Sequence, residues 1–192
     1  MRYKDFADTF QMDRKKILFY FAKADEILRD MGKDLILYVS GGANMCLYVS
    51  GRDSTHDIDT VPSDEALLRE LAIKMQALFN LPNGWLNPSG TIFVTGQMTD
   101  EAVLGLDFNN LKVYFLTHHA MLVLKVLSGR REPGKHDLHD TAVLIRKLGI
   151  KSVAEIDDLI NKYKPDWNNA FVLAFANEAL ALATTQLPPH QP

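Results

Sequence analysis

Two stretches of this sequence decide the fold: Val39-Ser40-Gly41-Gly42-Ala43 and, beginning 15 residues after Gly42, Asp57-Ile58-Asp59. The first ends a short apolar run rich in strand-forming residues, which predicts a buried strand, a small-residue turn and the start of a helix. Glycines in such a turn let backbone N–H groups approach a ligand closely, and a helix N-terminus favours phosphate. Alone, however, paired glycines after a strand often mark only a turn.

The second stretch brings two carboxylates together. Side chains alternate along a strand, so Asp57 and Asp59 share one face while Ile58 points to the other. Neighbouring carboxylates repel each other unless a cation lies between them. Oxygen ligands on a strand suit Mg²⁺, which keeps waters and substrate phosphates as its remaining ligands. Taken by itself, such a pair more often marks a solvated edge strand with two surface acids.

The elements around these stretches predict an α+β fold. Apolar spacing and flanking glycines and prolines predict strands at 35–39, 57–61, 91–95 and 111–116. The same reasoning predicts helices at 14–31, 43–49, 63–79 (with Ser63 as N-cap), 119–129, 138–148, 153–162 and 168–184. We therefore expect a core of residues 1–117 with an N-terminal helix and a small mixed sheet, followed by a helical region of residues 118–192 packed on it.

Composition excludes several classes of protein. The 192 residues are 47% hydrophobic and 23% charged, which is ordinary for a globular chain and excludes a disordered one. The net charge of −3 argues against nucleic-acid binding driven by bulk charge. A single cysteine, Cys46, excludes an internal disulfide and a multi-cysteine zinc site. No signal peptide is evident after Met1, and no apolar run approaches the roughly 18–20 residues that span a bilayer, so we expect a cytoplasmic protein without membrane contact.

Together, the two stretches resemble the signature of the nucleotidyltransferase superfamily with the DNA polymerase β-like fold: paired glycines, a short spacer, then Asp-x-Asp. The run Arg52-Asp53-Ser54-Thr55-His56-Asp57-Ile58-Asp59 is similar to one found in small bacterial members related to AbiE-type and minimal nucleotidyltransferases. Further parts of the chain that fit the same group are Trp85-Leu86-Asn87, Lys125, Arg130, Asp137 and Asp140. The resemblance spans residues 35–148.

The resemblance implies a polymerase β-like core and a Mg²⁺- or Mn²⁺-dependent transfer of a nucleoside monophosphate from an NTP to a hydroxyl group. The acceptor would be a protein, a tRNA end or a small molecule. The implied catalytic and metal-binding residues are Asp57 and Asp59. The residues implied for the phosphates are Ser40, Gly41, Gly42, Arg52 and Lys125, although Arg52 and Lys125 could instead be surface cations or ion-pair partners. Thr55 would shape the turn before the strand.

One feature of the family is missing from the sequence. Active members carry a third acid on a later strand, where it can act as a base toward the acceptor hydroxyl. The corresponding strand, 111–116, contains no acid; Asp107 lies just before it, and Asp100 and Glu101 lie further upstream. The alternative is therefore a catalytically degenerate member that binds a nucleotide or a cognate partner protein, as in a toxin–antitoxin-like pair. A purely structural protein with a surface Asp-x-Asp is a third hypothesis.

The run His136-Asp137-Leu138-His139-Asp140 is dense in metal-binding side chains, but its spacing suggests no further ligands. Acids in the first turn of a helix explain the two carboxylates more simply. The resemblance offers another role, in which Asp137 or Asp140 pairs with Arg130 and fixes two helices.

Overall fold

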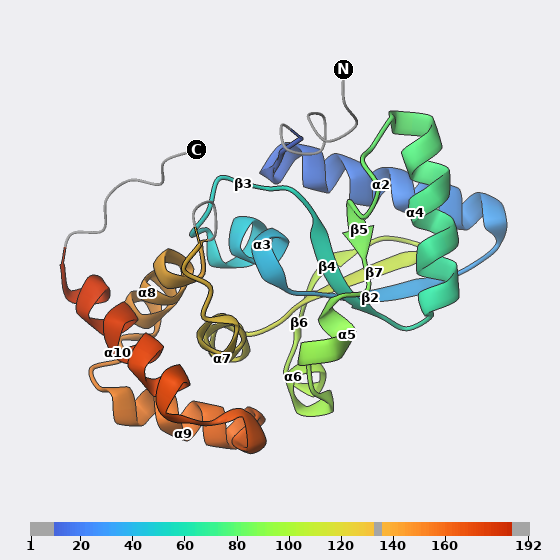
Figure 1. The fold of residues 1–192 in the computed structure, drawn as a ribbon. Helices are drawn as coiled ribbons and strands as arrows, with labels where there is room; N and C mark the ends of the chain where they lie inside the picture. Colours follow the sequence, from blue (N-terminus) through green and yellow to red (C-terminus); the bar gives the residue numbers. More distant parts are fainter. Residues whose placement is uncertain (1–9, 133–135, 186–192) are drawn as a thin grey trace. The chain divides into compact units, whose positions relative to one another are not determined.

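The structure is a computed structural model that describes residues 10–132 and 136–185. The N-terminal residues on which the expected absence of a signal peptide rests lie outside this part. The chain divides into two compact units: residues up to Val94 with Ala102–Leu116, and Thr95–Glu101 with the residues from Thr117 onward. The first unit holds the sheet and the second is helical (Figure 1). The expected α+β class, with a small mixed sheet and a helical C-terminal half, is confirmed.

The sheet of the first unit has five strands in the order β5-β4-β2-β7-β6. Their bounds are β2 Leu35–Val39, β4 Ile58–Pro62, β5 Leu86–Asn87, β6 Val103–Asp107 and β7 Leu111–Phe115. The central strand β2 runs parallel to β7 and antiparallel to β4, while β6 is antiparallel to β7. A separate short pair joins β1 (Met12–Asp13) to β3 (Ser54–Thr55). The sheet therefore brings the end of β2 beside the beginning of β4.

Two amphipathic helices supply the core that supports this sheet. They are α2 (Arg14–Met31) and α4 (Glu65–Phe79), and Phe21, Leu28 and Leu68 from them join the alternating inward residues of β2 and β7 in one hydrophobic cluster. Apolar residues that recur every 3.6 residues along the helices thus pack against apolar residues that alternate along the strands, as the sequence predicts. The bounds of α2 match the prediction.

The N-cap of α4 differs from the prediction. The side chain of Asp64, not Ser63, caps the helix by accepting a hydrogen bond from the backbone N–H of Leu67. The hydroxyl of Ser63 instead accepts a hydrogen bond from the backbone N–H of Ile36. Both serine and aspartate are common N-cap residues. Because the hydroxyl of Ser63 bonds to β2, Asp64 is the residue that caps the helix.

The predicted strand at residues 91–95 is wrong, because a short helix, α5 (Gly90–Phe93), occupies most of it. Gly90 packs directly on β4: a Cβ built on it would lie 2.8 Å from the backbone carbonyl oxygen of Thr60. The strand β6 was not predicted. Its residues are mostly exposed at the edge of the sheet, so no buried apolar run marks it.

The second unit consists of helices. Their bounds are α6 Gly96–Asp100, α7 His118–Ser128, α8 Asp137–Leu148, α9 Val153–Tyr163, the 3₁₀ turn η2 Pro165–Trp167 and α10 Ala170–Thr184. The four helices predicted after residue 117 are confirmed to within two residues at each end. Among the described residues, no helix combines the length and the apolar character that crossing a membrane requires.

Candidate functional site

The end of β2 and the start of β4 form the first part of the site. The backbone N–H of Ser40 donates a 2.9 Å hydrogen bond to the carbonyl of Asp59, and the Ser40 hydroxyl donates a 3.3 Å bond to the same oxygen. Ser40 is buried. Because Ser40 immediately precedes the glycine turn, these bonds place the turn beside Asp59.

Gly41 is the closest point of contact between the two stretches. A Cβ built on Gly41 would lie 2.4 Å from Oδ2 of Asp59, a distance that real side chains do not tolerate. Gly41 also has φ +59°, in the left-handed region that favours glycine. Two independent constraints therefore favour glycine here, and the carboxylate of Asp59 lies directly against the backbone of the turn.

Gly42 likewise packs closely against two side chains, those of Thr55 and Arg52. A Cβ built on it would lie 2.2 Å from Oγ1 of Thr55 and 2.9 Å from Nη1 of Arg52. The Thr55 hydroxyl donates a hydrogen bond to the carbonyl oxygen of Asp57, so Thr55 holds the backbone that leads into β4. The guanidinium group of Arg52 thus lies beside the glycine turn, where a cation could meet phosphate.

The two carboxylates flank a core residue. Ile58 is fully buried, while Asp57 and Asp59 on either side of it are partly exposed. Alternation along the chain therefore directs both acids away from the core. Asp57 lies just before β4 and Asp59 lies within it. Two such neighbouring carboxylates suit Mg²⁺, which takes the rest of its ligands from water and phosphate. Within residues 10–132 and 136–185, no group of three or more His, Cys, Asp or Glu side chains is arranged to hold a metal ion.

A buried amide ties the turn to the sheet. The helix after the glycines, α3 (Gly41–Asn44), continues as a π-helical turn, η1 (Met45–Val49), which confirms the helix predicted there. Asn44 at the junction is fully buried, and its Nδ2 donates to the carbonyl oxygens of Val39 and Leu116 at 2.9 and 3.1 Å. Asn44 thereby joins α3 to the ends of β2 and β7. The sequence carries one signal of this role, since Asn44 is a polar residue in an otherwise apolar segment.

The register of the sheet excludes Asp107 as a third acid beside Asp57 and Asp59. Asp107 is opposite Lys112 on β7, and Lys112 is opposite Ile36 on β2. Ile36 precedes Ser40, the neighbour of Asp59, by four residues, which is about 13 Å along a strand. The carboxylate of Asp107 lies 3.8 Å from the ammonium group of Lys112. Asp107 therefore belongs to the opposite end of the sheet.

Glu101 and Asp100, the acids further upstream, belong to the second unit. Glu101 accepts a 2.8 Å bond from the ammonium group of Lys162 and a hydrogen bond from the hydroxyl of Tyr163. These two bonds lower the pKa of Glu101. Its carboxylate is thus engaged within the helical unit.

Lys125, the remaining residue predicted for phosphate, also lies in the second unit and is buried. Its ammonium nitrogen lies 3.0 Å from Asp137 and 2.8 Å from Asp140, both fully or almost fully buried. Arg130 makes a 2.6 Å bond to Asp137, so the ion pair expected between two helices is present, with Lys125 as a second cation. A contact between Lys125 and phosphate stays a prediction.

The charges around Asp137 decide its protonation. Burial by itself would raise the pKa of this carboxyl. The hydrogen bond from Arg130 and the charge and hydrogen bond of Lys125 act in the opposite direction and prevail. The pKa of Asp137 therefore lies far below its usual range, and this carboxylate is ionised at neutral pH.

Comparison with known proteins finds one similar structure. A crystal structure of an antigenic nucleotidyltransferase-like protein from Paracoccidioides brasiliensis aligns over 86% of this chain and 95% of its own, with 16% sequence identity and a TM-score of 0.45. No protein-family profile matches the chain, and no curated protein matches its sequence. A likeness of this degree does not define a family for the chain.

Proposed function

We propose that this protein transfers a nucleoside monophosphate from an NTP to a hydroxyl acceptor in a Mg²⁺-dependent reaction. The observation that carries the proposal is the contact between the Gly41 backbone and the Asp59 carboxylate. A turn suited to phosphate and a carboxylate suited to a divalent cation lie side by side, although Gly41 and Asp59 are 18 positions apart in the sequence. That juxtaposition is what a nucleotide–metal complex requires.

Each group has a separate part in this proposal. Asp57 and Asp59 would hold the cation, Mg²⁺ or Mn²⁺, which neutralises charge on the triphosphate. The first N–H groups of a helix lack partners within it, so those of Gly41 and Gly42 would donate to phosphate oxygens. Arg52, whose guanidinium group lies against Gly42, would add positive charge at the same place. Ser40 and Asn44 would hold the turn in position.

The chemical step forms a bond between the acceptor oxygen and the α-phosphorus. The bond from the α-phosphorus to the bridging oxygen breaks, pyrophosphate leaves, and the hydroxyl proton passes to solvent. No third carboxylate of the described sheet lies beside Asp57 and Asp59 to accept that proton. We therefore expect transfer to be slow unless the acceptor or a partner protein supplies a base.

Thermal unfolding with Mg²⁺ and each NTP tests the proposal. A ligand present at a hundredfold excess over its Kd stabilises the folded state by about 2.7 kcal/mol, or roughly 5–10 °C in Tm for a chain of this size. The Asp57→Asn/Asp59→Asn variant should lose a metal-dependent NTP shift. Asp53→Asn, which changes an exposed acid four residues before Asp57, should keep it. No shift with any NTP in wild type would contradict nucleotide binding.

The missing third acid favours one other candidate, a degenerate member that binds nucleotide or a cognate partner without transferring it. Label from the α-phosphate of an NTP separates the two functions. Incorporation into the RNA, protein or small-molecule fraction of a cell lysate, lost in Asp57→Asn/Asp59→Asn, supports the transferase. A metal-dependent Tm shift without incorporation into any fraction supports the binding module.

A further inference from the structure

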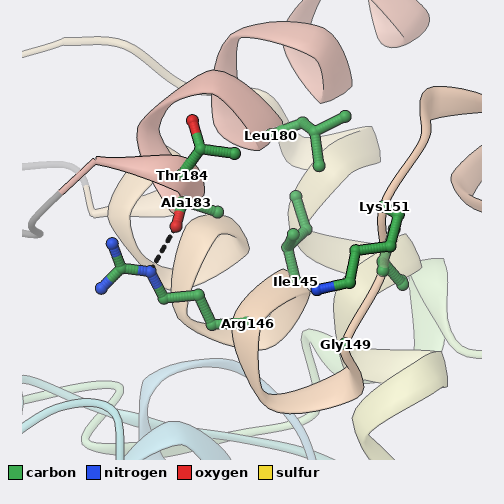
Figure 2. A pocket seen from close by; sticks show the side chains of 8 residues that line it. Ile145, Arg146, Gly149, Lys151, Leu180, Ala183 and Thr184 are labelled. Atoms are coloured by element: carbon green, nitrogen blue, oxygen red, sulfur yellow. Dashed lines mark hydrogen bonds between the residues drawn. The ribbon is translucent and has the colours of Figure 1, made fainter.

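A pocket of about 340 Å³ lies in the helical unit, and none of the site residues discussed above lines it. Its walls come from the last turns of α8 and α10 and from the loop that follows α8 (Figure 2). The whole lining belongs to one unit of the fold. No residue of this pocket was singled out in the sequence or takes part in the proposed transfer.

The floor of the pocket is apolar. Ile145, Ile150 and Ala183 are buried beneath it, and Leu180 forms part of the wall. At the share of about 30 Å³ that one water molecule occupies in the liquid, the pocket has room for roughly eleven non-hydrogen atoms. Its volume is at the lower end of the range for small-molecule sites. A compact ligand with an apolar body fits this space.

Two cations flank this floor. Figure 2 shows the side chain of Lys151 extending across the pocket toward Ile145, and the guanidinium group of Arg146 on the other side of Ile145. Nε of Arg146 donates a 2.5 Å hydrogen bond to the carbonyl oxygen of Ala183, which holds the side chain in place. Among the described residues, the side chains of Lys151 and Arg146 form no other hydrogen bond. The carboxylate of Glu155 accepts a hydrogen bond from the backbone N–H of Lys151, and the positive charge of Lys151 helps to lower the pKa of that carboxyl.

We propose that this pocket binds a small amphipathic carboxylate, with its apolar body on Ile145, Leu180 and Ala183 and its carboxylate on the ammonium group of Lys151. The charged N–H donors match the carboxylate of such a molecule, and the apolar floor matches its body. A neutral molecule of the same shape would form no ion pair with Lys151. The site is independent of the proposed nucleotidyl transfer.

Octanoate, with ten non-hydrogen atoms, is a suitable probe, and octanol is its neutral counterpart. We expect octanoate to raise the Tm of the full-length protein with a saturable concentration dependence and octanol to bind at least tenfold more weakly, as loss of a charge-assisted hydrogen bond implies. Lys151→Met should weaken octanoate binding to a similar extent. Lys147→Met removes a nearby cation that does not line the pocket and should bind octanoate like wild type.

Two further measurements guard against indirect effects. Isothermal titration at constant ionic strength should give one site per chain, and Leu180→Ala, which removes part of the apolar wall, should weaken octanoate binding while unfolding as cooperatively as wild type. Equal binding of octanoate and octanol would overturn the proposal. So would equal octanoate affinity in Lys151→Met and wild type, or equal losses in Lys151→Met and Lys147→Met.

Discussion

Replacing Gly41 with alanine adds a methyl group where the carboxylate of Asp59 lies. The backbone at Gly41 has φ +59°, which costs a non-glycine residue about 1–2 kcal/mol. The new Cβ would lie 2.4 Å from Oδ2 of Asp59, so that side chain must leave its rotamer, at a further cost of about 0.5–1.5 kcal/mol. We expect Gly41→Ala to lower the free energy of unfolding by about 2–3 kcal/mol.

Urea unfolding followed by circular dichroism measures this change, and Gly32→Ala is the matched control. Gly32 has φ +62°, but a Cβ built on it meets nothing within 4 Å. Its substitution should therefore cost only the backbone contribution, about 1–2 kcal/mol. Gly41→Ala should also abolish the metal-dependent NTP shift, since the displaced carboxylate is a proposed metal ligand, whereas Gly32→Ala should keep it.

A double-mutant cycle tests whether Asp59 is the cause. If the added methyl group acts through this carboxylate, Gly41→Ala should be less destabilising in an Asp59→Ala background than in wild type. Equal costs of Gly41→Ala and Gly32→Ala, together with additive effects of Gly41→Ala and Asp59→Ala, would refute the close contact on which the site is built.

Four other substitutions test side chains that support the fold. Asp25→Ala should cost about 2–3 kcal/mol in urea unfolding, because its buried carboxylate accepts from two backbone N–H groups, one of them at Asn110. Asn44→Ala should cost about 1–3 kcal/mol by the same measurement and weaken NTP binding, because it frees two buried carbonyl groups. Lys125→Met should cost about 3–5 kcal/mol, because it removes the ammonium group that lies against two buried carboxylates. The lowered pKa of Asp137 stabilises the fold above the ordinary aspartate pKa near 4 and ceases to do so as the pH falls further, so Asp137→Asn should flatten Tm against pH below pH 4.

The helices and the candidate site residues were determined by the sequence to a large extent. The helix Arg14–Met31 matches its prediction because a cap residue, an apolar period and a terminal glycine are signals that act within a few residues. Turn chemistry and alternation along a strand are local rules as well, and they marked the glycine pair and the two aspartates as candidates, whose roles came from the resemblance to a family signature. Local rules failed for β6 and α5, where exposure at an edge and packing of Gly90 on β4 decide the conformation.

Only the tertiary structure decided which of these residues meet. The contact of Gly41 with Asp59, the position of Asp107 at the far end of the sheet and the amide bonds of Asn44 all depend on strand order and register. Register follows from burying one face of every strand at once, so no short segment contains it. Lys125 shows the same limit: its charge was visible in the sequence, but the two carboxylates that hold it come from another helix.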